Sequence, residues 1–102
     1  RRSGMGLLDS AVSPEERTEL VARLDTFKAE GVEWHALKTR QAGTRRFISV
    51  HVLVPGDWTV QRGHDLLERI EEALRATRPG TVAFTHLEPL EDQRAYQDAG
   101  ER

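Results

Sequence analysis

A histidine and a glutamate stand two residues apart near the end of the chain, in the stretch TVAFTHLEP at residues 81–89. Apolar residues begin this stretch in a pattern typical of a β-strand, so His86 and Glu88 should project from the same face. An imidazole nitrogen and a carboxylate oxygen are both suitable ligands for zinc and neighbouring divalent metals. The spacing alone is a weak signal, because histidines on a half-exposed sheet are commonly ordinary surface residues.

Two further strand-like segments each carry one histidine, His35 in VEWHALKTR at 32–40 and His51 in RFISVHVLV at 46–54. Strict alternation in the first segment predicts one face shared by Glu33, His35, Leu37 and Thr39. In the second, the apolar face that should meet the core consists of Ile48, Val50, Val52 and Val54. His51 is therefore expected on the opposite, open face. The strand pair and the histidines of the adjacent strands could together supply three or four metal ligands. The fourth histidine, His64, falls in the first turns of an expected helix, toward the edge of the sheet.

Two amphipathic helices are expected to hold these strands in place. The sequence SPEE at 13–16 offers a capping serine, a proline at the first helical position and a capping-box glutamate, and predicts a helix over 14–30 that stops at Gly31. A second helix should follow the capping Thr59 and end before Arg78. Its buried face is predicted to consist of Leu66, Leu67, Ile70, Ala73 and Leu74. Between the first two strands, Gly43 suits the turn of a β-hairpin.

The order αββαβ predicts a two-layer α/β sandwich, of the α+β kind, with both helices on one face of a three-stranded sheet. A right-handed crossover through the second helix makes that sheet mixed. The opposite face has no helix to cover it, and a homodimer through this face is the simplest expectation. We expect residues 1–12 to be a linker, 13–90 to form the domain and 91–102 to be a polar, disordered tail.

Composition excludes several classes of protein. The 102 residues suffice for one small domain, and a net charge of −2 gives no signature of nucleic-acid binding. The chain has no cysteine, which excludes disulfides and thiolate metal sites. Its longest apolar run is too short for a membrane helix, and no signal peptide is visible. No G-x-S-x-G, H-E-x-x-H or Gly-rich phosphate loop indicates an enzyme. The missing initiator methionine suggests a soluble piece of a longer protein.

Several motifs in one continuous order resemble the cytoplasmic C-terminal domain of cation diffusion facilitator transporters, over about residues 6–90. They are GLLDS, SPEE, HALKTRQAGTRRFISVHVLVPGD, GHDLLERIEEAL and RPGTVAFTHLEP. The resemblance implies a ferredoxin-like, metallochaperone-like αββαβ domain that works as a homodimer below a six-helix membrane domain of the same polypeptide. Such transporters export Zn²⁺ or similar ions from the cytoplasm, usually in exchange for protons, so the domain would lie at the cytoplasmic face of the cell membrane.

The resemblance also implies a ligand set at the dimer interface, formed by His35, His51, His64, His86 and Glu88. Glu88 stands where some relatives have aspartate, and His35 matches a ligand that only some members use. The implied metal is Zn²⁺, or otherwise Cd²⁺, Mn²⁺, Fe²⁺, Co²⁺ or Ni²⁺. The implied function is a regulatory domain that senses metal and becomes compact, which promotes transport. The alternative is a freestanding metal-binding or purely dimerising module. Protons compete for histidine, so metal affinity should fall below about pH 6.5.

Two further features of the sequence each have two explanations. The basic residues of the expected hairpin tip are Lys38, Arg40, Arg45 and Arg46. We interpret them as a solvated turn, with contact to anionic lipid or to acidic loops of a transporter as the alternative. Asp9 matches a linker acid that pairs with the membrane domain in some relatives, and a simple turn before the helix explains it equally well.

Overall fold

The computed structural model describes residues 10–92, and its elements follow the predicted order αββαβ. They are helix α1 (Pro14–Asp25), the 3₁₀ helix η2 (Thr26–Glu30), strands β1 (Glu33–Ala42) and β2 (Arg45–Val54), helix α2 (Val60–Arg75) and strand β3 (Thr81–Pro89). Most of the predicted linker, with Asp9, and most of the predicted tail lie outside the described residues. No helix within 10–92 is long and apolar enough to cross a membrane.

Both predicted helix starts are confirmed by their caps. The Ser13 side chain accepts a hydrogen bond from the Glu16 backbone, and the Glu16 carboxylate accepts one from the Ser13 backbone. At the second helix, the Thr59 side chain accepts from the backbone of Arg62. Gly31 ends the first helical region with φ of 83°, a left-handed conformation that glycine adopts at little cost.

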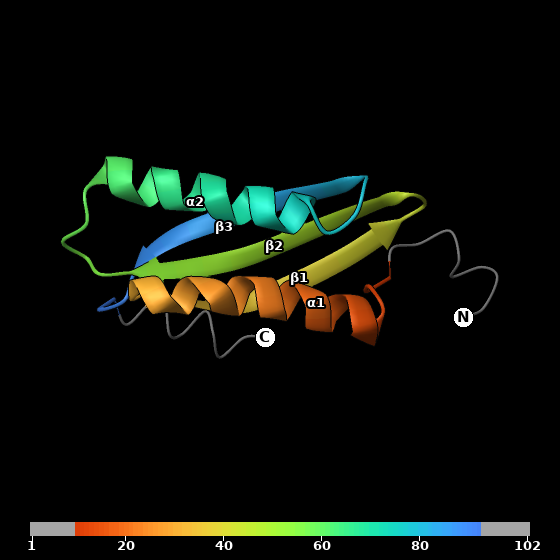
Figure 1. Ribbon diagram of the computed structural model, residues 1–102, viewed down its shortest axis with the longest axis horizontal. Helices are drawn as coiled ribbons and strands as arrows, with labels where there is room; N and C mark the ends of the chain where they lie inside the picture. Colours follow the sequence, from red (N-terminus) through yellow and green to blue (C-terminus); the bar gives the residue numbers. More distant parts are fainter. Residues whose placement is uncertain (1–9, 93–102) are drawn as a thin grey trace.

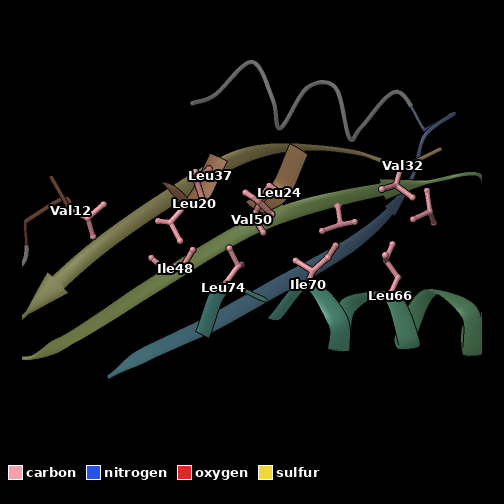
Figure 2. Close-up of a cluster of buried hydrophobic side chains, with 12 residues drawn as sticks. Val12, Leu20, Leu24, Val32, Leu37, Ile48, Val50, Leu66, Ile70 and Leu74 are labelled. Atoms are coloured by element: carbon pink, nitrogen blue, oxygen red, sulfur yellow. The ribbon is translucent and has the colours of Figure 1, made fainter. Parts of the chain in front are cut away.

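The sheet has the order β1-β2-β3, with β2 antiparallel to β1 and parallel to β3. Figure 1 shows both helices on the same side of this mixed sheet, so the predicted two-layer arrangement is confirmed. The core between the layers joins the apolar face of β2 to the inner faces of the helices (Figure 2). Its fully buried members include Leu20, Leu24, Ile48, Val50, Val52, Leu66, Ile70 and Leu74.

Strand β1 does not alternate strictly, and the prediction that Leu37 and Thr39 share a face with His35 is wrong. His35 pairs with His51, but the next regular pair joins Lys38 to Ser49, so β1 contains one extra residue at this point. Such a β-bulge reverses which residues face the core. Leu37 is accordingly only 5% exposed and belongs to the core. The bulge includes Ala36, whose φ of 56° is unusual for a residue with a side chain.

The interpretation of the basic hairpin tip as a solvated turn is wrong for Arg46. This residue is only 2% exposed. Its guanidinium donates to the Thr81 hydroxyl from Nε at 3.1 Å, to the Thr77 hydroxyl at 2.6 Å and to the Glu16 carboxylate at 3.2 Å. The same Glu16 oxygen lies 2.7 Å from Nε of Arg78. Arg46 therefore joins the start of α1 to the end of α2 and the start of β3.

The chain just before α1 is also fixed to the hairpin. The backbones of Ser10 and Gln41 exchange two hydrogen bonds, of 3.2 and 2.6 Å. Val12 is 7% exposed, and its amide donates to the Thr39 hydroxyl. Residues 10–12, which fall in the predicted linker, thus contact the domain directly.

Candidate metal centre

Three histidines form a row across the sheet, on the face that the helices leave open. His51 pairs with His35 on one side and with His86 on the other, because the hairpin sets the register of β1 and the α2 crossover sets that of β3. The ring centroids are 5.2 Å apart between His35 and His51, and 4.9 Å apart between His51 and His86. The open-face positions predicted for these three side chains are confirmed by this register.

Glu88 follows His86 on the same face of β3, and its carboxylate turns back toward the row. Its Oε2 lies 2.8 Å from Nδ1 of His51, and its Oε1 lies 3.8 Å from Nε2 of His35. The Glu88 side chain is only 13% exposed, and His35 is 9% exposed. Among the described residues, Glu88 Oε1 is buried and has no hydrogen-bond donor. Burying a charged carboxylate oxygen is costly unless a cation or a hydrogen-bond donor pairs with it.

The donor set fits a divalent metal ion. One ligand atom each from His35, His51 and Glu88 lies within 4.8 Å of the other two. Ligands at about 2.0–2.1 Å in a tetrahedral zinc site are about 3.3–3.5 Å from one another, so a small contraction of the side chains would bring the three atoms to that geometry. Two imidazoles and one carboxylate are also a ligand set that suits zinc and the neighbouring divalent metals.

The remaining two predicted ligands lie outside this group of three. His86 is exposed, and its ring stacks beside His51 at the edge of the group. His64 is exposed on the second turn of α2, in the helical layer. Its neighbour Gly63 lies against the side chain of Leu87, which places this end of α2 beside the end of β3. The single chain thus brings three predicted ligands together, places a fourth next to them and leaves His64 apart.

A hollow beside the histidine row was not predicted from the sequence. It has a volume of about 350 Å³ and is lined by Lys38, Thr39, Arg40, Phe47, Ile48, Ser49 and Phe84. Lys38 and Arg40 reach the open face only because the bulge reverses the alternation of β1. A glycine at a positive-φ position would have hinted at the bulge, but the chain has an alanine there.

Comparison with known proteins agrees with these observations. Residues 12–90 match the family model described as the cytoplasmic domain of cation efflux proteins. The uncharacterized transporter sll1263 of Synechocystis sp. is 46% identical over 101 residues, which cover 99% of this chain and 33% of that protein. The cation-efflux pump FieF of Escherichia coli K12 is 32% identical over 84 residues, which cover 81% of this chain and 27% of the pump. The chain thus spans about a third of the length of these relatives.

Solved structures show the same fold. The structure of CzrB in its Zn form superposes with a TM-score of 0.73 at 37% identity, over 80% of this chain and 93% of that one. The metal-bound C-terminal domain of the CzcD transporter from Thermotoga maritima gives a TM-score of 0.69 at 26% identity, over 76% and 91% of the two chains. On these matches and on the αββαβ fold, the chain belongs to the cation diffusion facilitator family and corresponds to the cytoplasmic domain of its cation efflux proteins.

Proposed function

We propose that this chain is the metal-sensing and dimerisation domain of a divalent-cation efflux transporter. The observation that carries the proposal is the meeting of His35, His51 and Glu88 within 4.8 Å on the open face of the sheet. The CzrB and CzcD domains, which share this fold, have been solved with zinc and with bound metal. The transporter would include a membrane domain in the same polypeptide, sit at the cytoplasmic face of the membrane and exchange the cation for protons.

Each proposed ligand has a distinct place in this scheme. His35, His51 and Glu88 hold one ion, and His86 supplies the next imidazole in the row. His64 lies apart from the others within one chain, so we assign it to the edge of the interface, where a second copy approaches. Zn²⁺ is the best match to imidazole and carboxylate ligands, and Cd²⁺, Mn²⁺, Fe²⁺, Co²⁺ and Ni²⁺ are the alternatives.

Metal binding would act through the relative stability of two dimer states. The open face carries the proposed ligands, and no helix within residues 10–92 covers it, so it is the surface on which two copies would meet. A metal ion can favour the compact dimer only by binding it more tightly than the splayed dimer. Protons compete with the metal for the imidazole nitrogens, so acidification would weaken metal binding.

The test is calorimetric titration of the metal-free chain with Zn²⁺ at neutral pH, beside sedimentation measurements of its oligomeric state. We expect micromolar or tighter binding that weakens at least about tenfold in His51→Ala and in Glu88→Gln. Glu33→Gln is the matched control, because Glu33 is an exposed carboxylate on the same sheet. Parent-like binding by both His51→Ala and Glu88→Gln would refute the site. Tight binding with no change in sedimentation would refute the sensing role and leave a metal-binding module.

A further inference from the structure

We propose that Arg17 is a positioning residue of the candidate metal centre. Its guanidinium holds the β-bulge of β1, and the bulge turns His35 toward the open face of the sheet. Arg17 is on α1, in the helical layer, and is not one of the proposed ligands. The inference rests on the proposed metal-binding role, but the hold of Arg17 on the bulge can be tested without metal.

The register of the hairpin shows what the bulge does to His35. From the turn, regular pairing continues along β1 as far as Lys38, which lies opposite Ser49. Continued without the extra residue, the same register would place His35 opposite Val52, whose side chain is buried in the core. Residues directly opposite each other share a face of the sheet, so His35 would then point toward the helices. With the bulge His35 pairs with His51 instead, and its imidazole reaches the open face.

The backbone of the bulge is strained and depends on support from its surroundings. Ala36 and Leu37 together lie opposite the single residue Val50. Ala36 has a φ of 56°, a left-handed conformation that is unfavourable for a residue with a Cβ. Strained backbone of this kind persists only where neighbouring groups hold it in place. The group that holds the bulge therefore also determines where His35 lies.

Arg17 reaches the bulge from α1. It precedes Leu20 and Leu24, which point into the core (Figure 2), by three and seven residues, so it lies on the same side of the helix. Its Nη1 donates to the Leu37 carbonyl oxygen at 3.3 Å in a partly buried position. A bulge disrupts the ladder of backbone hydrogen bonds, and a charged donor is a strong replacement for the lost partner. Arg17 also lines a hollow of about 300 Å³ together with His35 and both bulge residues.

Other contacts along β1 leave this role to Arg17. The segment before α1 bonds to β1 at Gln41 and at the Thr39 side chain. Both contacts are nearer to the hairpin turn, whereas Arg17 bonds to the bulge itself, two residues from His35. Loss of the Arg17 guanidinium should therefore loosen β1 around His35 and leave the rest of the hairpin paired.

The test compares Arg17→Gln with the parent 102-residue chain. In the metal-free chains, amide hydrogen exchange followed by NMR should be about three- to tenfold faster at residues 35–38 of the variant, since one hydrogen bond shifts a local opening equilibrium by this factor. Calorimetric titration with Zn²⁺ should show an affinity that is weaker by about the same factor. Removal of a positive charge would by itself strengthen the binding of a cation, so weaker binding is not explained by charge.

Two further variants separate positioning from a general loss of stability. Arg23→Gln is the matched control, because Arg23 is on the same helix and its Nη1 also donates to a carbonyl oxygen, that of Ala73 in α2 at 3.2 Å. It should leave Zn²⁺ affinity and exchange at residues 35–38 within about twofold of the parent. Ala36→Gly supplies the rescue, because glycine adopts a positive φ without strain. Combined with Arg17→Gln, it should restore Zn²⁺ affinity to nearly that of Ala36→Gly alone. Circular dichroism checks that all variants fold.

The outcomes distinguish this inference from the metal-binding role. If the parent binds Zn²⁺, then parent-like affinity or parent-like exchange in Arg17→Gln would overturn the positioning role. Equal losses in Arg17→Gln and Arg23→Gln, or no rescue by Ala36→Gly, would overturn it as well. If the parent binds no Zn²⁺, the proposed function fails, and exchange at residues 35–38 alone decides whether Arg17 holds the bulge.

Discussion

Replacing Glu16 with glutamine should unfold this domain more easily, because Glu16 is the carboxylate that pairs with the buried Arg46. The Arg46 side chain is 2% exposed and that of Glu16 is 12% exposed. Water therefore has little access to solvate the Arg46 charge once the Glu16 charge has been removed. Glutamine retains the capping box at the start of α1, since its side-chain oxygen can still accept from the Ser13 backbone. The substitution therefore tests the charge of Glu16 apart from its role as a cap.

The magnitude follows from the contacts that change. A hydrogen bond to a charged group in a buried setting contributes about 1.5–3 kcal/mol, which applies to Arg46 and Glu16 at 3.2 Å. The pair with Arg78, whose side chain is 53% exposed, adds about 0–1 kcal/mol. We expect Glu16→Gln to lower the free energy of unfolding by about 1.5–4 kcal/mol at pH 7. Urea denaturation followed by circular dichroism measures this difference.

The loss should depend on pH in a defined direction. The pKa of Glu16 is held below its ordinary value of 4.5, first by the hydrogen bond from the Ser13 backbone, then by the Ser13 hydroxyl, Arg78 and Arg46, against the opposing effect of burial. A carboxyl whose pKa is lower in the folded chain stabilises the fold fully above the unfolded pKa. That contribution disappears as the pH falls through the folded value. The difference between parent and Glu16→Gln should therefore shrink below about pH 4.5.

A matched pair on the surface supplies the control. Glu30 accepts two hydrogen bonds of 2.8 Å from Arg69, but their side chains are 38% and 52% exposed. Glu30→Gln should cost only about 0.2–1 kcal/mol, since water screens this pair. Adding Arg46→Met to Glu16→Gln should recover part of the loss, because it removes the unpaired buried charge. A cost for Glu16→Gln below about 0.5 kcal/mol, or equal to that of Glu30→Gln, would refute the reasoning.

Four further substitutions test other parts of the fold by the same denaturation assay. Gly80→Ala should destabilise by at least about 2 kcal/mol, because φ is 78° and the new Cβ would lie 2.4 Å from the Thr44 carbonyl oxygen; an unchanged midpoint would mean that this loop is not held as described. Leu66→Ala should cost about 2–5 kcal/mol, since Leu66 is fully buried in the core; a loss below about 1 kcal/mol would contradict its place there. Ala36→Gly should be neutral or stabilise by up to about 1 kcal/mol, because it relieves the positive φ, whereas Ala22→Gly on the exposed side of α1 should destabilise by about 0.5–1 kcal/mol. Equal losses at both alanines would argue against the bulge.

The elements themselves were predictable because each is specified by local signals. The caps at Ser13 and Thr59, the glycine at the hairpin turn and the apolar alternation of β2 act within a few residues of one another. The open-face positions of His51 and His86 followed from the same alternation, since β2 and β3 are regular along their whole length. Local patterns of this kind therefore predicted the fold and most of the candidate metal centre.

The failures have a common cause, which is that they depend on contacts between distant elements. The bulge at Ala36 reverses the alternation of β1, and no glycine marks it, so strict alternation predicts the wrong face for Leu37. Arg46 resembles its basic neighbours in sequence, but it is buried because Thr81 and Glu16 reach it from elements 35 and 30 residues away. Partners at such separations cannot be identified from the spacing of residues along one segment.

The position of Glu88 in the last strand determines when the cluster can form during synthesis. His35 and His51 come together in a hairpin, which is a local structure, but Glu88 is 37 residues beyond His51 and reaches it only after α2 has crossed over the sheet. A growing chain therefore presents only His35 and His51 of this group of three until β3 has been made and paired. In the proposed metal-binding role, ions that meet the unfinished chain would find an incomplete ligand set, and the order of synthesis would delay tight capture until the domain is folded.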